Sequence, residues 1–181
     1  GSFKYSVNDY LSAVKSDDSI SELSKAMLNY GLCSQDYFGY NAPSKTPDIA
    51  TVRYSEYDVK TEGTLPEGVT YVGSSLLLNT KTTIRHYFKT NGNTVNFKIE
   101  GNPVTATTIG NICYVEVKDI KAVDLDKAYE VTVSDESSIY TLKYSAMSYC
   151  QKANSVSTDS KLKTLADSLY WYCVAAKEYF K

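Results

Sequence analysis

The sequence predicts an α+β fold in which an antiparallel β-sandwich is flanked by two homologous helical hairpins. Three observations support this prediction. Segments near the two ends of the chain repeat each other, the repeated segments have the period of an amphipathic helix, and the segment between them alternates with a period of two. Of the 181 residues, 43% are hydrophobic and 22% are charged, which is the composition of a globular protein of one or two domains.

An internal repeat appears when the two ends of the chain are aligned. Residues 3–11 match residues 142–150, residues 23–30 match residues 165–172, and Tyr37-Phe38 matches Tyr179-Phe180. The second copy has a slightly longer loop between the first two matches. Matches on both sides of one small insertion indicate a duplication.

Each copy has the pattern of two helices joined by a loop. In the first copy, Val7, Tyr10 and Val14 follow the spacing of an amphipathic helix that Ser6 would cap. A second helix follows in each copy, and we call its apolar face the seam. In the first copy the seam consists of Ile20, Leu23, Met27, Tyr30, Ser34 and Tyr37. In the second copy it consists of Leu162, Leu165, Leu169, Tyr172, Ala176 and Tyr179. We therefore expect helical hairpins at residues 1–41 and 144–181. Because neither hairpin buries its apolar face alone, the two should pack together as a four-helix cluster.

The segment between the hairpins, residues 42–143, begins with a linker rich in Pro, Ser and Asn and then changes to a period of two. The alternating segments are residues 69–72, 83–88, 95–99, 112–117, 129–133 and 140–143. Turn-forming sequences such as Asn91-Gly92 and Gly110-Asn111 separate several of them. Six or seven short strands at this spacing are typical of an immunoglobulin-like antiparallel β-sandwich.

Three segments resemble a known kind of module. Residues 26–41 have the pattern AMLNYGxxxQxYFGYN, residues 68–76 read GVTYVGSSL, and residues 82–88 read TTIRHYF. These segments resemble the helical-hairpin and β-sandwich repeat modules of large secreted or cell-surface modular proteins of anaerobic Gram-positive gut bacteria, a family without established activity. The resemblance implies an extracellular, non-catalytic accessory region whose partners include neighbouring modules of the same chain.

Composition and motifs argue against several functional classes. The net charge of -2 does not suit a nucleic-acid-binding protein, and no apolar stretch is long enough for a membrane span. The single histidine, His86, shares the face of its alternating segment with Ile84 and Phe88, while Arg85 and Tyr87 point the other way. We expect a packed core histidine, and no nucleophile motif accompanies it. The sequence therefore predicts no enzyme, no cofactor and no bound metal.

Four cysteines occupy apolar positions of the local patterns, and these are Cys33, Cys113, Cys150 and Cys173. Buried thiols are the expected state, with one disulfide between helices as the alternative.

The leading functional interpretation is a non-enzymatic structural, spacer or interaction module. The alternative is a carbohydrate- or ligand-binding module that uses aromatic residues of the sandwich. Trp171 lies outside the apolar seam of its helix, so it either docks the hairpin on the sandwich, which is the favoured interpretation, or contacts a partner such as a glycan or a surface protein. Tyr54, Tyr57 and Tyr87 are the further candidates, expected to be exposed and able to stack on sugar rings.

Overall fold

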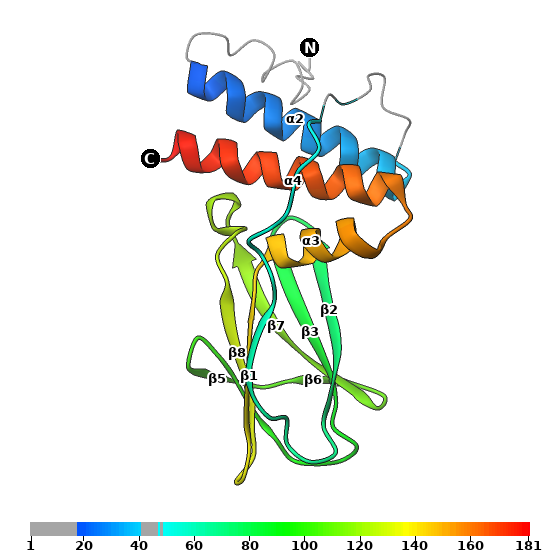
Figure 1. Cartoon of the computed structure of the whole chain (residues 1–181), viewed down its shortest axis with the longest axis vertical. Helices are drawn as coiled ribbons and strands as arrows, with labels where there is room; N and C mark the ends of the chain where they lie inside the picture. Colours follow the sequence, from blue (N-terminus) through cyan, green and yellow to red (C-terminus); the bar gives the residue numbers. More distant parts are fainter. Residues whose placement is uncertain (1–17, 41–46, 48) are drawn as a thin grey trace, which may run out of the picture. The chain divides into compact units, whose positions relative to one another are not determined.

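The chain folds into two compact units (Figure 1). A computed structural model describes residues 18–40, 47 and 49–181. Within them it confirms the α+β class, with three α-helices and nine strands in two antiparallel sheets. Residues 55–149 form the β unit, and residues 150–181 form the helical unit together with the described residues up to Tyr54.

The boundaries of these units fall at Tyr54/Ser55 and Tyr149/Cys150, whereas the sequence placed them at 41/42 and 143/144. Side chains of the helical unit hold the segment before Ser55, as described below. The first turn of helix α3 (Ala146–Val156) belongs to the β unit, where the Met147 amide donates to the Leu125 carbonyl at 3.1 Å. A local sequence pattern does not predict long-range hydrogen bonds of this kind.

The β unit contains both sheets. The five-stranded sheet has the order β1 (Lys60–Gly63), β9 (Ile139–Tyr144), β8 (Tyr129–Ser134), β4 (Asn96–Ile99) and β5 (Asn102–Val104). The four-stranded sheet has the order β2 (Thr70–Leu78), β3 (Thr82–Lys89), β7 (Ile112–Ile120) and β6 (Thr107–Ile109). A 3₁₀ turn, η1 (Ala122–Asp124), precedes β8. All six alternating segments of the sequence form strands, and the three strands that it did not predict are short pieces at the sheet edges.

The inner faces of the two sheets contact each other. Phe88 of β3 is fully buried, and its ring centroid lies 5.3 Å from that of Phe97 of β4. Val131, Val133 and Leu142 of the five-stranded sheet are also fully buried. This arrangement is compatible with the predicted β-sandwich and places the core of the unit between its sheets.

Some turns and strand ends of the β unit use residues that tolerate positive φ. Asn91 and Gly92 have φ values of 51° and 86° in the turn after β3, as expected for the Asn-Gly pair. Gly63 at the end of β1 has a φ of 76°, and a Cβ there would lie 2.1 Å from the Ile139 carbonyl oxygen. This close approach of two backbones explains why a glycine ends the strand.

His86 lies in the core, as the alternation predicted. Its side chain is fully buried, and its Nδ1 lies 2.6 Å from Ser74 Oγ, which lies 2.6 Å from Tyr71 Oη. Among the described residues its Nε2 has no hydrogen-bond partner, and the ring meets Tyr144 edge to face at 5.3 Å. Burial lowers the pKa of His86 from 6.5 to about 4, so the imidazole is neutral at pH 7.

The helical unit is built on two long helices, α2 (Asp18–Phe38) and α4 (Ser160–Tyr179), which lie side by side and antiparallel (Figure 1). Tyr30 and Tyr172, which are equivalent in the sequence repeat, stack on each other with ring centroids 5.6 Å apart. On α2 the buried apolar residues are Ala26 and Cys33, whereas Met27 of the predicted seam is 37% exposed. The predicted helix after Ser6 lies outside the described residues, so the four-helix cluster stays a prediction.

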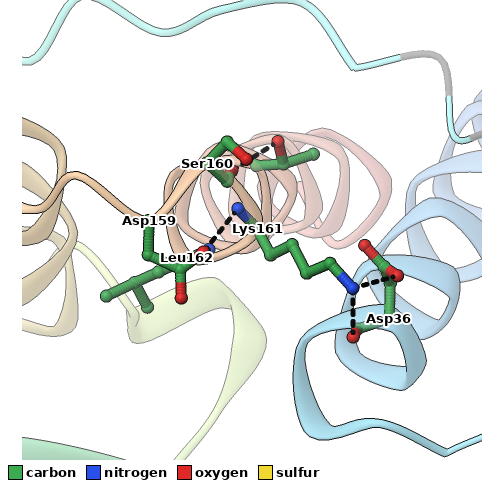
Figure 2. Close-up of polar contacts among 6 residues, drawn as sticks. Asp36, Asp159, Ser160, Lys161 and Leu162 are labelled. Carbon is green, nitrogen blue, oxygen red and sulfur yellow. Dashed lines mark hydrogen bonds and ion pairs between the residues drawn. The ribbon is translucent and has the colours of Figure 1, made fainter.

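The first turn of α4 is capped and anchored to the end of α2 (Figure 2). Asp159 accepts hydrogen bonds from the backbone amides of Lys161 at 2.9 Å and Leu162 at 3.3 Å. The Lys161 ammonium contacts the Asp36 carboxylate at 3.0 Å and also donates to the Asp36 carbonyl at 3.4 Å. Because both charged groups are about half exposed to solvent, this ion pair aligns the two helix ends but adds little to the free energy of unfolding.

All four cysteines are buried thiols in the structure, which agrees with the expected state. Burial raises the pKa of Cys33, Cys113 and Cys150, so these sulfurs are protonated and poorly nucleophilic at neutral pH. No helix in the described part of the chain combines the length and hydrophobicity needed to cross a lipid bilayer.

The buried histidine makes the β unit sensitive to acid. Because its pKa is lower in the folded state than in the unfolded state, folding loses stability as the pH falls from about 6.5 to about 4. We expect the wild-type β unit to lose about 3 kcal/mol between pH 7 and pH 4 beyond the loss shown by a His86→Gln variant. Hydrogen exchange of the β3 and β7 amides at the two pH values measures this difference. Equal losses in the two proteins would contradict the neutral, buried state of His86.

Candidate functional site

The outer face of the four-stranded sheet carries a group of polar and aromatic side chains that contact one another. We call Ser75, Arg85, Tyr87, Tyr114 and Glu116 the outer-face array. In the strand register Arg85 pairs with Ser75 on one side and Glu116 on the other, while Tyr87 pairs with Tyr114. These residues alternate along β3 and β7 with the buried residues of the core, so they lie on the solvent side of the sheet.

The centre of the array is an ion pair. Arg85 Nε and Nη2 donate to Glu116 Oε1 at 2.9 and 2.6 Å, and Lys118 Nζ lies 3.1 Å from Glu116 Oε2. Although partial burial alone would raise the pKa of Glu116, the hydrogen bonds and charges of Arg85 and Lys118 lower it. The hydrogen bond to Glu116 raises the pKa of Arg85 in turn, so both groups are charged at neutral pH.

Two tyrosines complete the array. The Arg85 guanidinium carbon lies 4.2 Å from the centroid of the Tyr114 ring, and that centroid lies 5.8 Å from the Tyr87 ring. The Tyr87 hydroxyl is 3.1 Å from Ser75 Oγ. Each side chain of the array therefore contacts another member of the array.

The array is bordered by open space on two sides. Gly73 of β2 pairs with Tyr87, has a φ of 148°, and would place a Cβ with no atom within 4 Å. Beyond Tyr114, a cavity of about 250 Å³ is lined by Val104, Thr105, Thr107, Tyr114, Val115, Glu116 and Lys118. The surface next to the array is thus hollowed and mostly polar.

Of the predicted binding residues, Trp171 and Tyr54 belong to the helical unit. Trp171 is 38% exposed, and its indole N–H donates to the Ala50 carbonyl at 2.8 Å. The expectation of an exposed Tyr54 is wrong, because its ring is half-buried and its hydroxyl donates to the Asp167 carboxylate at 3.1 Å. Both side chains therefore attach the segment around residues 50–54 to α4.

Tyr57 and Tyr87 belong to the β unit and are half-buried, where the sequence predicted exposure. Packing against Tyr114 and hydrogen bonding to Ser75 reduce the exposure of Tyr87. Of the four predicted residues, only Tyr87 belongs to the outer-face array. Sequence analysis did not single out Tyr114 and Glu116, although the alternation of residues 112–117 placed both on the outer face.

Asp167 is a second residue that the sequence did not identify. It lies outside the apolar seam that the sequence predicts for this helix, but it is only 6% exposed and accepts hydrogen bonds from Tyr54 and from Asn154 Nδ2 at 3.0 Å. Burial raises the pKa of the Asp167 carboxyl, although the hydrogen bonds from Tyr54, Asn154 and the Val52 backbone act in the opposite direction. This cluster joins α3, α4 and the segment before Ser55 within the helical unit.

The helical unit also contains a groove of about 400 Å³, lined by Glu22, Lys25, Ala26, Asn29, Ile49, Ala50, Trp171, Val174, Ala175 and Glu178. Its charged residues are Glu22 and Lys25 on α2 and Glu178 on α4. Over the described ranges, no three His, Cys, Asp or Glu side chains gather as a metal site would require.

No protein-family model, curated protein or solved structure matches the chain.

The bond between Tyr54 and Asp167 leads to a prediction for a Tyr54→Phe variant. Loss of this donor should raise the pKa of Asp167 further and destabilise the helical unit by about 1.5 kcal/mol at pH 7. A carboxyl group whose pKa is raised by folding costs stability once it ionises. The free energy of unfolding should therefore fall more steeply with rising pH in the variant. Carboxyl-carbon NMR titration and denaturant unfolding measure both effects, with Tyr40→Phe as the control at a residue that is 71% exposed. An unchanged Asp167 titration would contradict the role assigned to Tyr54.

Proposed function

We propose that this chain is a non-enzymatic interaction module of a modular extracellular bacterial protein and that it makes its contacts through the outer-face array. The observation that carries the proposal is a set of contacts on the solvent side of strands whose other side is core. They link Arg85 to Glu116 and Tyr114, and Tyr87 to Tyr114 and Ser75. Ordering such long side chains costs conformational entropy, which a face that served only for solubility would not need. A surface that is ordered before binding loses less entropy when a partner arrives.

The extracellular setting rests on the resemblance of residues 26–41, 68–76 and 82–88 to modules of secreted and cell-surface proteins. The proposal includes two finer statements about the fold: the β unit is an immunoglobulin-like sandwich, and the helical unit is a cluster of two homologous hairpins. The stacking of Tyr30 on Tyr172 supports the second part, because the duplication makes these two residues equivalent. Neighbouring modules of the same chain are the first partners, and a glycan or a surface protein is the external one.

The state of His86 supports a non-enzymatic role. It is the only imidazole in the sequence, and it is fully buried and neutral. A general base must come within hydrogen-bond reach of the proton that it removes, which the core position of His86 does not allow for an external substrate. A pure spacer would share this feature, but it would have no use for the ordered array.

Carbohydrate binding is a second candidate function. The specific observation that favours it is the position of Tyr87, which is paired with Gly73, where no side chain fills the space, and which contacts Ser75 and Tyr114. Carbohydrate-binding surfaces need such a combination, because a sugar has both apolar C–H bonds and hydroxyl groups.

Co-sedimentation tests the interaction proposal. The chain is mixed with insoluble plant cell walls, with peptidoglycan and with intact Gram-positive cells, and the bound fraction is measured. We expect wild type and a Tyr40→Ala control to be retained on at least one material, and an Arg85→Ala/Tyr87→Ala double variant to lose most of that retention. Equal retention of the double variant, or no retention of folded wild type, would contradict the proposal. Soluble products released from the material would contradict the non-enzymatic part.

A further inference from the structure

We infer that the outer-face array is a binding site for a neutral saccharide, in which Tyr87 is the stacking platform and Arg85 and Glu116 bind the hydroxyl groups. This inference rests on the proposed interaction function and names the class of its ligand. Four features support it: the shape beside Tyr87, the polar groups near that residue, the cavity next to Tyr114 and the ion contacts of Glu116.

The shape beside Tyr87 leaves room for a sugar ring. β2 is an edge strand, and Gly73 is the residue that it places opposite Tyr87. Any other residue would project a side chain there, and the positive φ of 148° disfavours any residue except glycine. A pyranose has one face of C–H bonds that packs on an aromatic ring, as other flat apolar groups do. The strand geometry therefore leaves a place for this face next to Tyr87.

The polar groups lie at a suitable spacing from that place. Arg85 is two residues from Tyr87 on the same face of β3, which corresponds to about 7 Å along the strand. Glu116 is paired with Arg85 on β7 and is held by two hydrogen bonds. A sugar ring stacked at Tyr87 would direct its hydroxyl groups toward a guanidinium that donates and a carboxylate that accepts. Hydroxyl groups satisfy both, because each is a donor and an acceptor.

The cavity beyond Tyr114 extends the site by a second sugar unit. Its volume is about 250 Å³, and its lining includes the Thr105 and Thr107 side chains together with Glu116. In the register of β6 and β7, Thr107 is directly opposite Tyr114, so the cavity lies on the same face as the array. A ligand with at least two linked sugar units would reach from Tyr87 into this cavity.

The ion contacts of Glu116 favour a neutral ligand. Both oxygens of Glu116 are already in contact with cations, Oε1 with Arg85 and Oε2 with Lys118. An acidic ligand would compete with Glu116 for these partners, whereas hydroxyl groups add to the network without breaking it. A protein partner would need an apolar centre. The exposed large apolar residues of this sheet are Val72 and Ile109, which lie on its two opposite edge strands, β2 and β6.

Isothermal titration calorimetry of the full chain tests the inference, with cellohexaose, xylohexaose and mannohexaose as neutral probes. We expect at least one probe to bind. Tyr87→Ala should weaken this binding by about tenfold or more, because it removes the platform, whereas Tyr87→Phe should stay within about threefold of wild type. Glu116→Gln, which keeps the shape but loses the charge, should weaken binding by a factor between these two. Tyr40→Ala, at an exposed tyrosine outside the array, is the control and should bind as wild type does.

Four outcomes would overturn the inference. They are no binding of any neutral probe at millimolar concentration, unchanged affinity in a folded Tyr87→Ala variant, loss of binding on Trp171→Ala rather than Tyr87→Ala, and binding of oligogalacturonate alone with loss of affinity at high salt. If array-dependent co-sedimentation persists while the neutral probes fail, the saccharide assignment is wrong and the interaction function stands. If co-sedimentation also fails, both are wrong.

Discussion

The antiparallel pairing of β3 with β2 on one side and with β7 on the other determines what this protein presents to solvent and what it buries. A strand flanked on both sides alternates its side chains strictly, so Ile84, His86 and Phe88 enter the core while Arg85 and Tyr87 face outward. A slip of one residue would bury the guanidinium and expose the imidazole. The core and the outer-face array are therefore two consequences of a single register.

Buried polar groups make this register, and the packing of the helical unit, specific. The hydrogen bonds that run from Tyr71 through Ser74 to His86 Nδ1 form only when β2 and β3 pair as they do. Asp167 has the corresponding role in the helical unit, because its carboxylate is satisfied only when Tyr54 and Asn154 converge on it. These hydrogen bonds add little to the net free energy of unfolding, but a misaligned chain would leave their donors and acceptors buried and unpaired.

Local periodicity predicted the parts of the fold that depend on one strand or one helix alone. It placed His86 in the core and Tyr87 outside, and it found six of the nine strands that the structure describes. It could not predict that Tyr114 and Glu116 lie beside Tyr87 and Arg85, because that depends on the pairing of segments about thirty residues apart. It gave no sign that Asp167 would be buried or that Trp171 would bond to Ala50. Hydrogen bonds between distant segments decide both positions.

The central claim is that the outward side chains of β3 and β7 bind a neutral saccharide and that the inward ones do not take part in binding. A map of backbone amide chemical shifts, recorded by NMR as a neutral hexasaccharide is added to the labelled chain, tests this claim most directly. We expect the shifted amides to cluster at residues 73–75, 85–87, 107 and 114–116. Shifts that centre on α4 around Trp171, or a spectrum that does not change with any of the three hexasaccharides, would contradict it.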